Sequence, residues 1–231
     1  MSKMLLALEP VVKLIDYLFT IRASIKKITG DHYYLWNNDF KAGMVFLTDT
    51  KGAGSNIVNP STIRHGAIYF GTGLRSAIEA LITECETDDL LEEAHRLETI
   101  LDKYKIHDDI CYVIEAVGSG VKPTNLVKFM TTKDLFKAFI PNFCDEMAMR
   151  QASLNSLHDL GLPYDFAFTD RNKAKYCFEV AANAYEMLGI NKLKKHMFKL
   201  LGIELYACFT SDTFDKDVIN WKCTIDSNKQ L

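Results

Sequence analysis

The fold is decided by the stretch Gly161-Leu-Pro-Tyr-Asp-Phe-Ala-Phe168 and by Tyr176-Cys-Phe-Glu-Val180, which follows it. A glycine followed by a proline ends a helix, so the first stretch predicts a helix end and then a loop. A new helix is expected from about residue 172 to about residue 188, with Asp170 or Asn172 as its N-cap. This places Cys177 in the first turns, where the positive end of the helix dipole favours a thiolate.

Several strands are expected around this region. They are Lys41-Ala-Gly-Met-Val-Phe-Leu-Thr-Asp49, Arg64-His-Gly-Ala-Ile-Tyr-Phe-Gly71, Ile110-Cys-Tyr-Val-Ile-Glu-Ala-Val117 and residues 135–140. Two helices, broken near residue 87, are expected between residues 74 and 104, and another over residues 145–160. Because strands and helices do not alternate strictly, we expect an α+β domain with a mainly antiparallel sheet packed against helices.

The composition is that of a water-soluble globular chain. It has 231 residues, of which 48% are hydrophobic and 25% charged, enough for one domain with a sizeable core. Lys and Arg total 27 against 30 Asp and Glu, a formal net charge of -3, so the basic footprint of a general nucleic-acid binder is missing. No nucleic-acid partner is therefore expected.

The cysteine pattern favours reduced thiols. Six cysteines occur, at positions 85, 111, 144, 177, 208 and 223, without close CxxC pairs. Reduced thiols indicate a cytoplasmic location. Since Cys and His do not cluster at ligand spacing, neither a metal nor another cofactor is expected.

Residues 1–40 are expected to form an N-terminal helical segment ahead of the main domain over residues 41–231. The apolar run from residue 4 to residue 28 is interrupted by Glu9, Lys13, Asp16 and Arg22. A spanning helix needs about 20 nearly uninterrupted apolar residues, so no integral membrane segment is expected. The apolar face of this helix is expected to pack on the core, with contact to a membrane surface or a partner as the alternative.

A thiol nucleophile requires a base, and the sequence offers one. His65 opens a predicted strand, and Glu115 lies in another, on the same face as Val113 and Val117. A carboxylate there needs a partner, because an unpaired buried charge is costly. Each residue also has a structural interpretation, since free cysteines are among the most buried residues. Spacing alone leaves both interpretations open.

The strand sequences resemble those of a known family. Arg64–Gly71 resembles the His-x-x-Ile-Tyr-x-Gly strand of the circularly permuted papain-like (NlpC-type, YiiX-like) cysteine hydrolases and amidases. Lys41–Asp49 is similar to the Gly-Asp-Ile-Ile-Leu strand that precedes it in that family. Tyr112-Val-Ile-Glu-Ala116, with Gly118-Ser-Gly-Val121, is similar to the family's Ile-Glu-Ala … Gly-Val strand.

The nucleophile region carries the strongest resemblance. Residues 161–168 resemble Gly-x-Pro-Tyr-Asp-Phe-x-Phe, and Tyr176–Val180 with the later Tyr185 resembles Tyr-Cys-Ser-Glu-Leu followed by Ala-Tyr. Over residues 41–185 the elements stand in the permuted order of histidine, third polar residue and cysteine. Papain-like enzymes without the permutation place the cysteine first.

The resemblance implies a permuted papain-like fold and a set of roles. Cys177 would be the nucleophile, His65 the general base and then acid, and Glu115 the residue that orients the imidazole. The Cys177 backbone N–H would donate to the oxyanion, and Tyr176 and Tyr164 would line the pocket. The implied reaction is cleavage of an amide, or of an ester or thioester, through a thioacyl-enzyme intermediate.

Three departures and two alternatives accompany this implication. Phe178 stands where the family has a small or polar residue, and residues 74–108 form a helical insertion that compact members lack. The N-terminal helix and the tail after about Leu188 have no counterpart in the family. The alternatives are a lipid acyltransferase or phospholipase of the lecithin:retinol acyltransferase-like branch, and a catalytically inactive binding module. The expected partner is a small peptide-like or lipid substrate, and the short form would suit a viral or bacterial accessory protein.

Overall fold

In the computed structural model, the described residues are 28–50, 61, 63–87, 90–166, 168, 173–190, 192–200 and 203–229. The helix expected over residues 4–28 lies outside these ranges except for its last residue. Of the expected N-terminal segment, the structure describes α2 (Gly30–Trp36) and the short 3-10 helix η1 (Asn37–Asp39).

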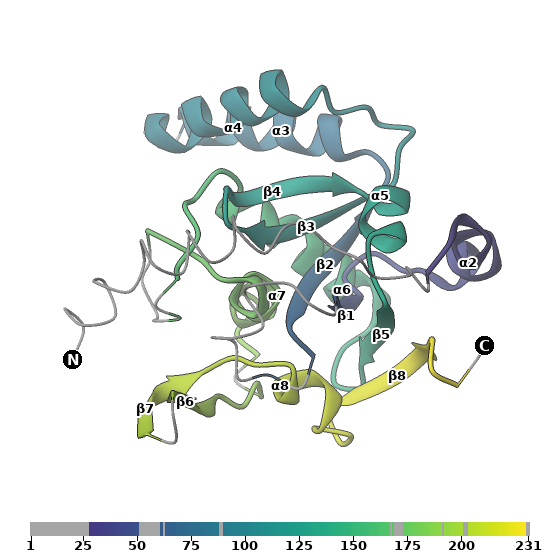
Figure 1. The fold of residues 1–231 in the computed structure, drawn as a ribbon. Helices are drawn as coiled ribbons and strands as arrows, with labels where there is room; N and C mark the ends of the chain where they lie inside the picture. The colour runs from purple at the N-terminus through teal and green to yellow at the C-terminus, as the bar shows by residue number, and fades with distance from the viewer. Residues whose placement is uncertain are drawn as a thin grey trace.

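Six strands form one antiparallel sheet in the order β4-β3-β2-β1-β5-β8 (Figure 1). Their bounds are β1 (Val45–Asp49), β2 (His65–Gly71), β3 (Tyr112–Val117), β4 (Gly120–Asn125), β5 (Leu135–Pro141) and β8 (Trp221–Asp226). A separate hairpin joins β6 (His196–Leu200) to β7 (Ile203–Cys208). The expected α+β fold with an antiparallel sheet is confirmed.

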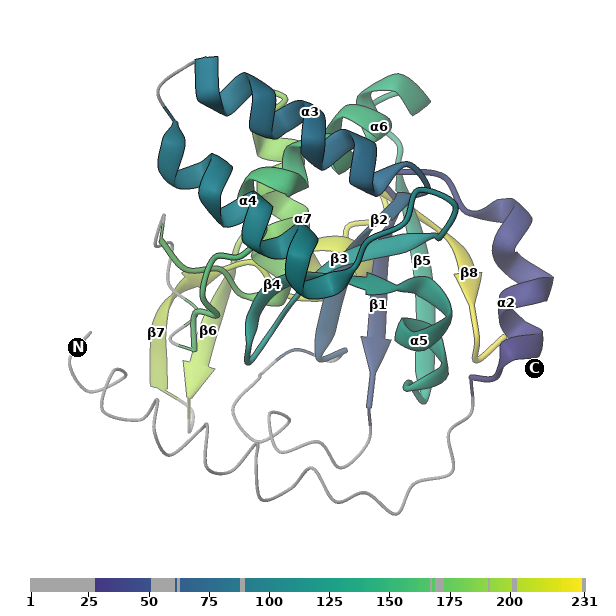
Figure 2. The same cartoon turned by 90° about the horizontal axis from the view of Figure 1, so that it is seen from above.

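Helices cover both faces of this sheet (Figure 2). Their bounds are α3 (Leu74–Thr87), α4 (Leu91–Tyr104), α5 (Leu126–Thr131), α6 (Glu146–Asn155), the 3-10 helix η3 (Ser156–Asp159), α7 (Cys177–Glu186) and α8 (Asp212–Asp215). α7 packs on β2 and β3 and against α6, while α5 packs on β3 and β4 and against α2. Both faces of the sheet are therefore covered by helices.

Alternation along β2 divides the core into two clusters. Ile68 and Phe70 point to the α7 side, whereas Ala67 and Tyr69 point to the α5 side. Because both faces are covered, the central strands read as continuous apolar runs rather than as an apolar and polar alternation.

The helical insertion forms a hairpin at the edge of the molecule, beyond β4 (Figure 1). α3 and α4 pack on each other and break between Thr87 and Leu91, as the sequence predicts. Their inner faces are fully part of the core on the α7 side, with Leu74, Ile78 and Leu97 completely buried. The high charge density of this segment belongs to its outer face.

The start of α7 was predicted wrongly. The helix was expected to begin near residue 172 with Asp170 or Asn172 as the cap, but the N-cap is Tyr176 and the helix begins at Cys177. The Tyr176 backbone N–H donates to the Glu179 carboxylate at 3.5 Å, so a glutamate in the first turn serves the helix start. Cys177 is therefore the first residue of the helix.

Within the described ranges, no helix is both long enough and apolar enough to span a membrane.

Candidate active site

A polar pair joins β2 to β3. His65 Nε2 lies 2.7 Å from Glu115 Oε2, because antiparallel pairing sets Ala67 opposite Glu115 and directs both side chains to the α5 side of the sheet. The Thr124 hydroxyl, on β4, donates to Glu115 Oε1 at 2.5 Å. The carboxylate that the sequence singled out as needing a partner therefore has two.

The hydrogen bonds fix the protonation of this pair. Burial alone would raise the pKa of Glu115, but His65, Lys133 and Thr124 outweigh it and hold that pKa at about 2. An ionised carboxylate can only accept, so His65 Nε2 carries the proton and Nδ1 keeps a lone pair. Burial and the charge of Lys133 lower the pKa of His65 against the opposing effect of Glu115. The ring is thus a neutral imidazole with Nδ1 as its basic atom.

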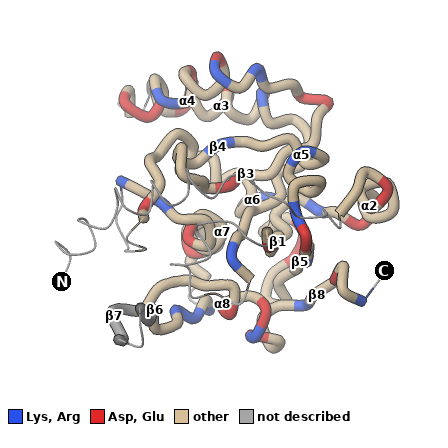
Figure 3. The backbone as a smooth tube through the Cα atoms, in the orientation of Figure 1, with Lys and Arg blue, Asp and Glu red and all other residues tan. Residues whose placement is uncertain are grey.

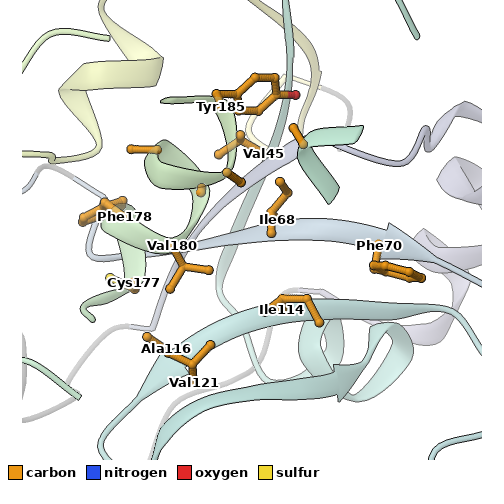
Figure 4. Close-up of a cluster of buried hydrophobic side chains, with 14 of the residues drawn as sticks. Val45, Ile68, Phe70, Ile114, Ala116, Val121, Cys177, Phe178, Val180 and Tyr185 are labelled. Atoms are coloured by element: carbon orange, nitrogen blue, oxygen red, sulfur yellow. The ribbon is translucent and has the colours of Figure 1, made fainter. Parts of the chain in front are cut away.

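The thiol of Cys177 reaches the sheet beside His65. Its Sγ lies 4.0 Å from the carbonyl oxygen of Arg64, the residue before His65. Arg64 directly precedes β2, so the thiol lies at the start of this strand. Figure 4 shows Cys177 among apolar side chains of the core on the α7 side.

Burial governs the state of this thiol. Cys177 is 1% exposed, and burial raises its pKa to about 11. The backbone N–H groups of Gly66, Phe178 and Cys177 act in the opposite direction, while the charge of Glu115 raises the pKa further. The thiolate that the sequence analysis expected at the helix start is therefore not the resting form, because desolvation outweighs the amide dipoles.

The His65 ring and the thiol approach the same point of β2 from different sides. The ring lies on the α5 side, 5.9 Å between centroids from Phe129, while α7 packs on the other side. Among the described residues, which include both side chains, no hydrogen bond joins the ring to Cys177 Sγ. The structure thus brings His65 and Glu115 into contact and sets Cys177 against the neighbouring backbone.

The two tyrosines expected to line a pocket occupy different surroundings. Tyr176 is fully buried, and its hydroxyl accepts the Phe209 backbone N–H at 2.7 Å. Tyr164 is half-buried and packs edge-on against Phe166 and Phe168, with ring centroids 4.8 and 6.5 Å away. Tyr176 thus has a structural function here, and contact of Tyr164 with a substrate stays a prediction.

Three supporting residues were missed in the sequence. Thr124 holds Glu115, and a threonine in a strand gives no signal of such a role. Lys175 forms a buried ion pair with Glu179 at 3.0 Å, which anchors the segment that leads into α7. Gly66 allows α7 to approach, because a Cβ there would meet the Phe178 ring at 2.7 Å. The sequence carried a signal for Gly66 only, namely a glycine directly after His65 together with the bulky Phe178.

Taken together, a cysteine that begins a helix, packed on an antiparallel sheet with a histidine–carboxylate pair, defines a papain-like class of domain. Residues 39–206 match the family model described as permuted papain-like amidase enzyme, YaeF/YiiX, C92 family. The chain belongs to this family, as the resemblance implied. No curated protein was found to match the chain.

A solved structure has a similar fold. It is the metalloprotein YiiX from Escherichia coli O157:H7, with a TM-score of 0.54 and 15% sequence identity, over 81% of this chain and 97% of that one. At this identity the similarity concerns the fold. In the part of this chain that the structure describes, no group of three or more His, Cys, Asp or Glu side chains is placed to hold a metal ion.

Proposed function

We propose that this protein is a cysteine amidase that cleaves an amide bond of a peptide-like substrate, with Cys177 as nucleophile and His65 as its base. The observation that carries this proposal is the position of the thiol, which lies against the backbone next to His65, while Glu115 holds the ring by Nε2. The family supports hydrolysis of amides. A peptide-like substrate is our addition to the amidase activity that describes the family.

The resting site supports proton transfer during attack rather than a preformed ion pair. The thiol and the imidazole are both neutral, since the pKa of Cys177 is raised to about 11 and that of His65 is lowered. As the sulfur–carbon bond forms, the thiol proton moves to His65 Nδ1. The same proton then protonates the leaving amine as the carbon–nitrogen bond breaks.

Hydrolysis of the thioester completes the cycle. A water molecule gives its proton to His65 Nδ1, attacks the thioester carbonyl and releases the acid, and the proton returns to the thiolate. Glu115 stabilises the imidazolium formed in both halves, as an ionised carboxylate with two donors. In the structure the ring and the thiol approach β2 from different sides, so catalysis requires Nδ1 and the sulfur to come into contact when substrate binds.

The backbone N–H groups around the sulfur are suited to stabilise the oxyanion. Those of Gly66, Phe178 and Cys177 lie close enough to the sulfur to lower its pKa. They are fixed by β2 and by the first turn of α7, so no reorganisation is needed as charge develops. This extends the role that the sequence analysis gave to the Cys177 N–H alone.

A catalytically inactive binding module is the second candidate. The observation that favours it is the 1% exposure of Cys177, together with the unformed contact between ring and thiol. In that case the thiol is a packed core residue and the polar pair only links the strands.

Labelling with an acyl-type thiol probe separates the two candidates. Peptide mapping by mass spectrometry locates the label, because the exposed Cys223 also reacts. We expect a label on Cys177 in the parent protein and in Cys223→Ala, and no labelling in the double variant Cys177→Ala/Cys223→Ala. Absence of label on Cys177 in Cys223→Ala would support the inactive module.

A further inference from the structure

A small pocket opens at the edge of the sheet, away from the thiol. It has a volume of about 280 Å³ and lies between the end of α4, the strand β4 and the start of α5. Its polar lining includes Lys105, Lys122, Lys128, His107, Tyr104 and Tyr112. None of its lining residues is acidic, so the pocket gathers positive charge in a chain whose formal net charge is -3.

One carboxylate lies near the three lysines, that of Glu115, which is opposite Lys122 across β3 and β4 and already accepts from His65 and Thr124. Within the described residues, Lys105, Lys122 and Lys128 form no ion pair with a carboxylate. Figure 3 shows basic positions on β4 and α5, the two elements that carry Lys122 and Lys128. A concave surface lined by one sign of charge concentrates ions of the opposite sign.

The backbone that carries these side chains is ordered. Lys105 ends α4 in a left-handed conformation, with φ at 46° and its N–H bonded to the Leu101 carbonyl. The Tyr112 hydroxyl accepts the His107 N–H at 3.2 Å, and Asn125 accepts the Lys128 N–H at 3.1 Å. The cationic groups therefore come from three fixed elements rather than from one mobile loop.

The size of the pocket limits its ligand. Pockets for drug-sized molecules have volumes of about 300–1,000 Å³, so this one suits a small group. Lysine binds phosphate as a point charge, and three lysines match a group with two negative charges. We propose that this pocket binds the phosphate group of a phosphate ester. Its source is either a soluble ester or the headgroup of an anionic phospholipid.

The pocket is distinct from the proposed nucleophile but adjoins its polar pair. Thr124 lines the pocket, and its hydroxyl donates to Glu115. Cys177 does not line it. The phosphate site does not depend on the proposed amidase activity, and it can be tested in a protein that is catalytically silent.

Calorimetric titration of the full chain tests the proposal. The probes are inorganic phosphate, glycerol 3-phosphate, and vesicles of phosphatidylcholine with or without phosphatidic acid. We expect phosphate to bind, and Lys122→Gln and Lys128→Gln each to weaken its binding about tenfold, the effect of losing one charge-assisted contact. Lys103→Gln, which removes a lysine of α4 outside the pocket, is the matched control and should change binding less than about twofold.

The outcomes are distinct. Binding of glycerol 3-phosphate but not of vesicles identifies a soluble ester as the source, and binding of vesicles only when they contain phosphatidic acid identifies a lipid headgroup. Absence of binding to all probes overturns the proposal. Equal weakening in Lys103→Gln and Lys122→Gln overturns it too, because the effect would then be one of net charge.

Discussion

Glu115 and Cys177 are two acids buried to nearly the same extent, 4% and 1% exposed, yet their pKa values move in opposite directions. Burial raises both pKa values. At Glu115 hydrogen-bond donors and cations outweigh burial and bring the pKa to about 2, whereas the pKa of Cys177 reaches about 11. The difference lies in the neighbours. Glu115 meets His65, Lys133 and a hydroxyl, while Cys177 meets only backbone amides and the repulsive charge of Glu115.

The contrast shows that the two buried acids are held in different protonation states. The carboxylate is permanently charged and fixes the imidazole, and the thiol is stored as a neutral group. In the proposed mechanism, charge on sulfur is created only when His65 takes the proton, next to amides that stabilise it. Under this proposal His65 acts as a general base, and no thiolate–imidazolium pair is present at rest.

Removal of His65 should have the largest effect on the rate of hydrolysis. In His65→Ala the neutral thiol has no base, so hydrolysis of an activated p-nitrophenyl ester should fall by about 10²–10⁴, the usual contribution of general acid–base catalysis. The matched control is His95→Ala, whose side chain is 85% exposed. A fall of less than about threefold in His65→Ala would remove the base from the account.

Alkylation tests whether Cys177 is a neutral thiol in the resting protein. The thiolate is the reactive form, so at pH 7 iodoacetamide should modify the exposed Cys223 at least about tenfold faster than Cys177 in the native protein. Peptide mapping by mass spectrometry measures both sites in one sample. Faster modification of Cys177 would show a resting thiolate, which the position at the helix start predicts from sequence.

Acid should destabilise the fold through the polar pair. The lowered pKa of His65 means that the unfolded chain binds a proton first, so stability falls as pH drops below about 6.5. Glu115 loses its contribution between its ordinary pKa, about 4.5, and about 2, on the order of 3 kcal/mol. Urea unfolding as a function of pH should show both steps.

The matched variants for this pH profile are Glu115→Gln and Glu98→Gln, the second at an exposed site. Glu115→Gln should remove the lower step, whereas Glu98→Gln should keep it. A profile that is the same in all three proteins would mean that Glu115 is not held as an ion.

The approach of α7 to β2 predicts a smaller effect. Gly66→Ala would place a methyl group 2.7 Å from the Phe178 ring and should cost about 1–3 kcal/mol of unfolding free energy. In the double variant Gly66→Ala/Phe178→Leu the clash is relieved, so the two costs should sum to more than the measured total. Additive costs in urea unfolding would mean that the two residues do not touch.

The parts of the fold set by local pattern could be predicted from sequence. The strands β1, β2, β3 and β5, the break between α3 and α4, and the end of the helical segment at Gly161 follow from apolar runs and punctuating residues. Alternation and the cost of an unpaired charge predicted that Glu115 needs a partner, and the family resemblance implied that this partner is His65.

The parts of the fold that depend on contacts between distant residues could not be predicted from sequence. β4 was missed because Lys122 and Pro123 are poor strand residues, which an edge strand tolerates. β8 pairs with β5, about eighty residues earlier, so no local signal identifies it. Tyr176 is not a preferred cap, which hid the start of α7. The burial of Cys177 depends on α7, β2 and β3 together, and a helix-dipole argument cannot supply it.

The most direct test of Cys177 as the nucleophile is to trap the acyl-enzyme. The protein is mixed with an activated p-nitrophenyl ester, quenched in acid, and its peptides are mapped by mass spectrometry. The account predicts an acyl group on Cys177 that appears within one turnover, decays as the thioester hydrolyses, and forms at least about tenfold more slowly in His65→Ala. Acylation confined to Cys223 or to surface lysines, with Cys177 unmodified, would contradict it.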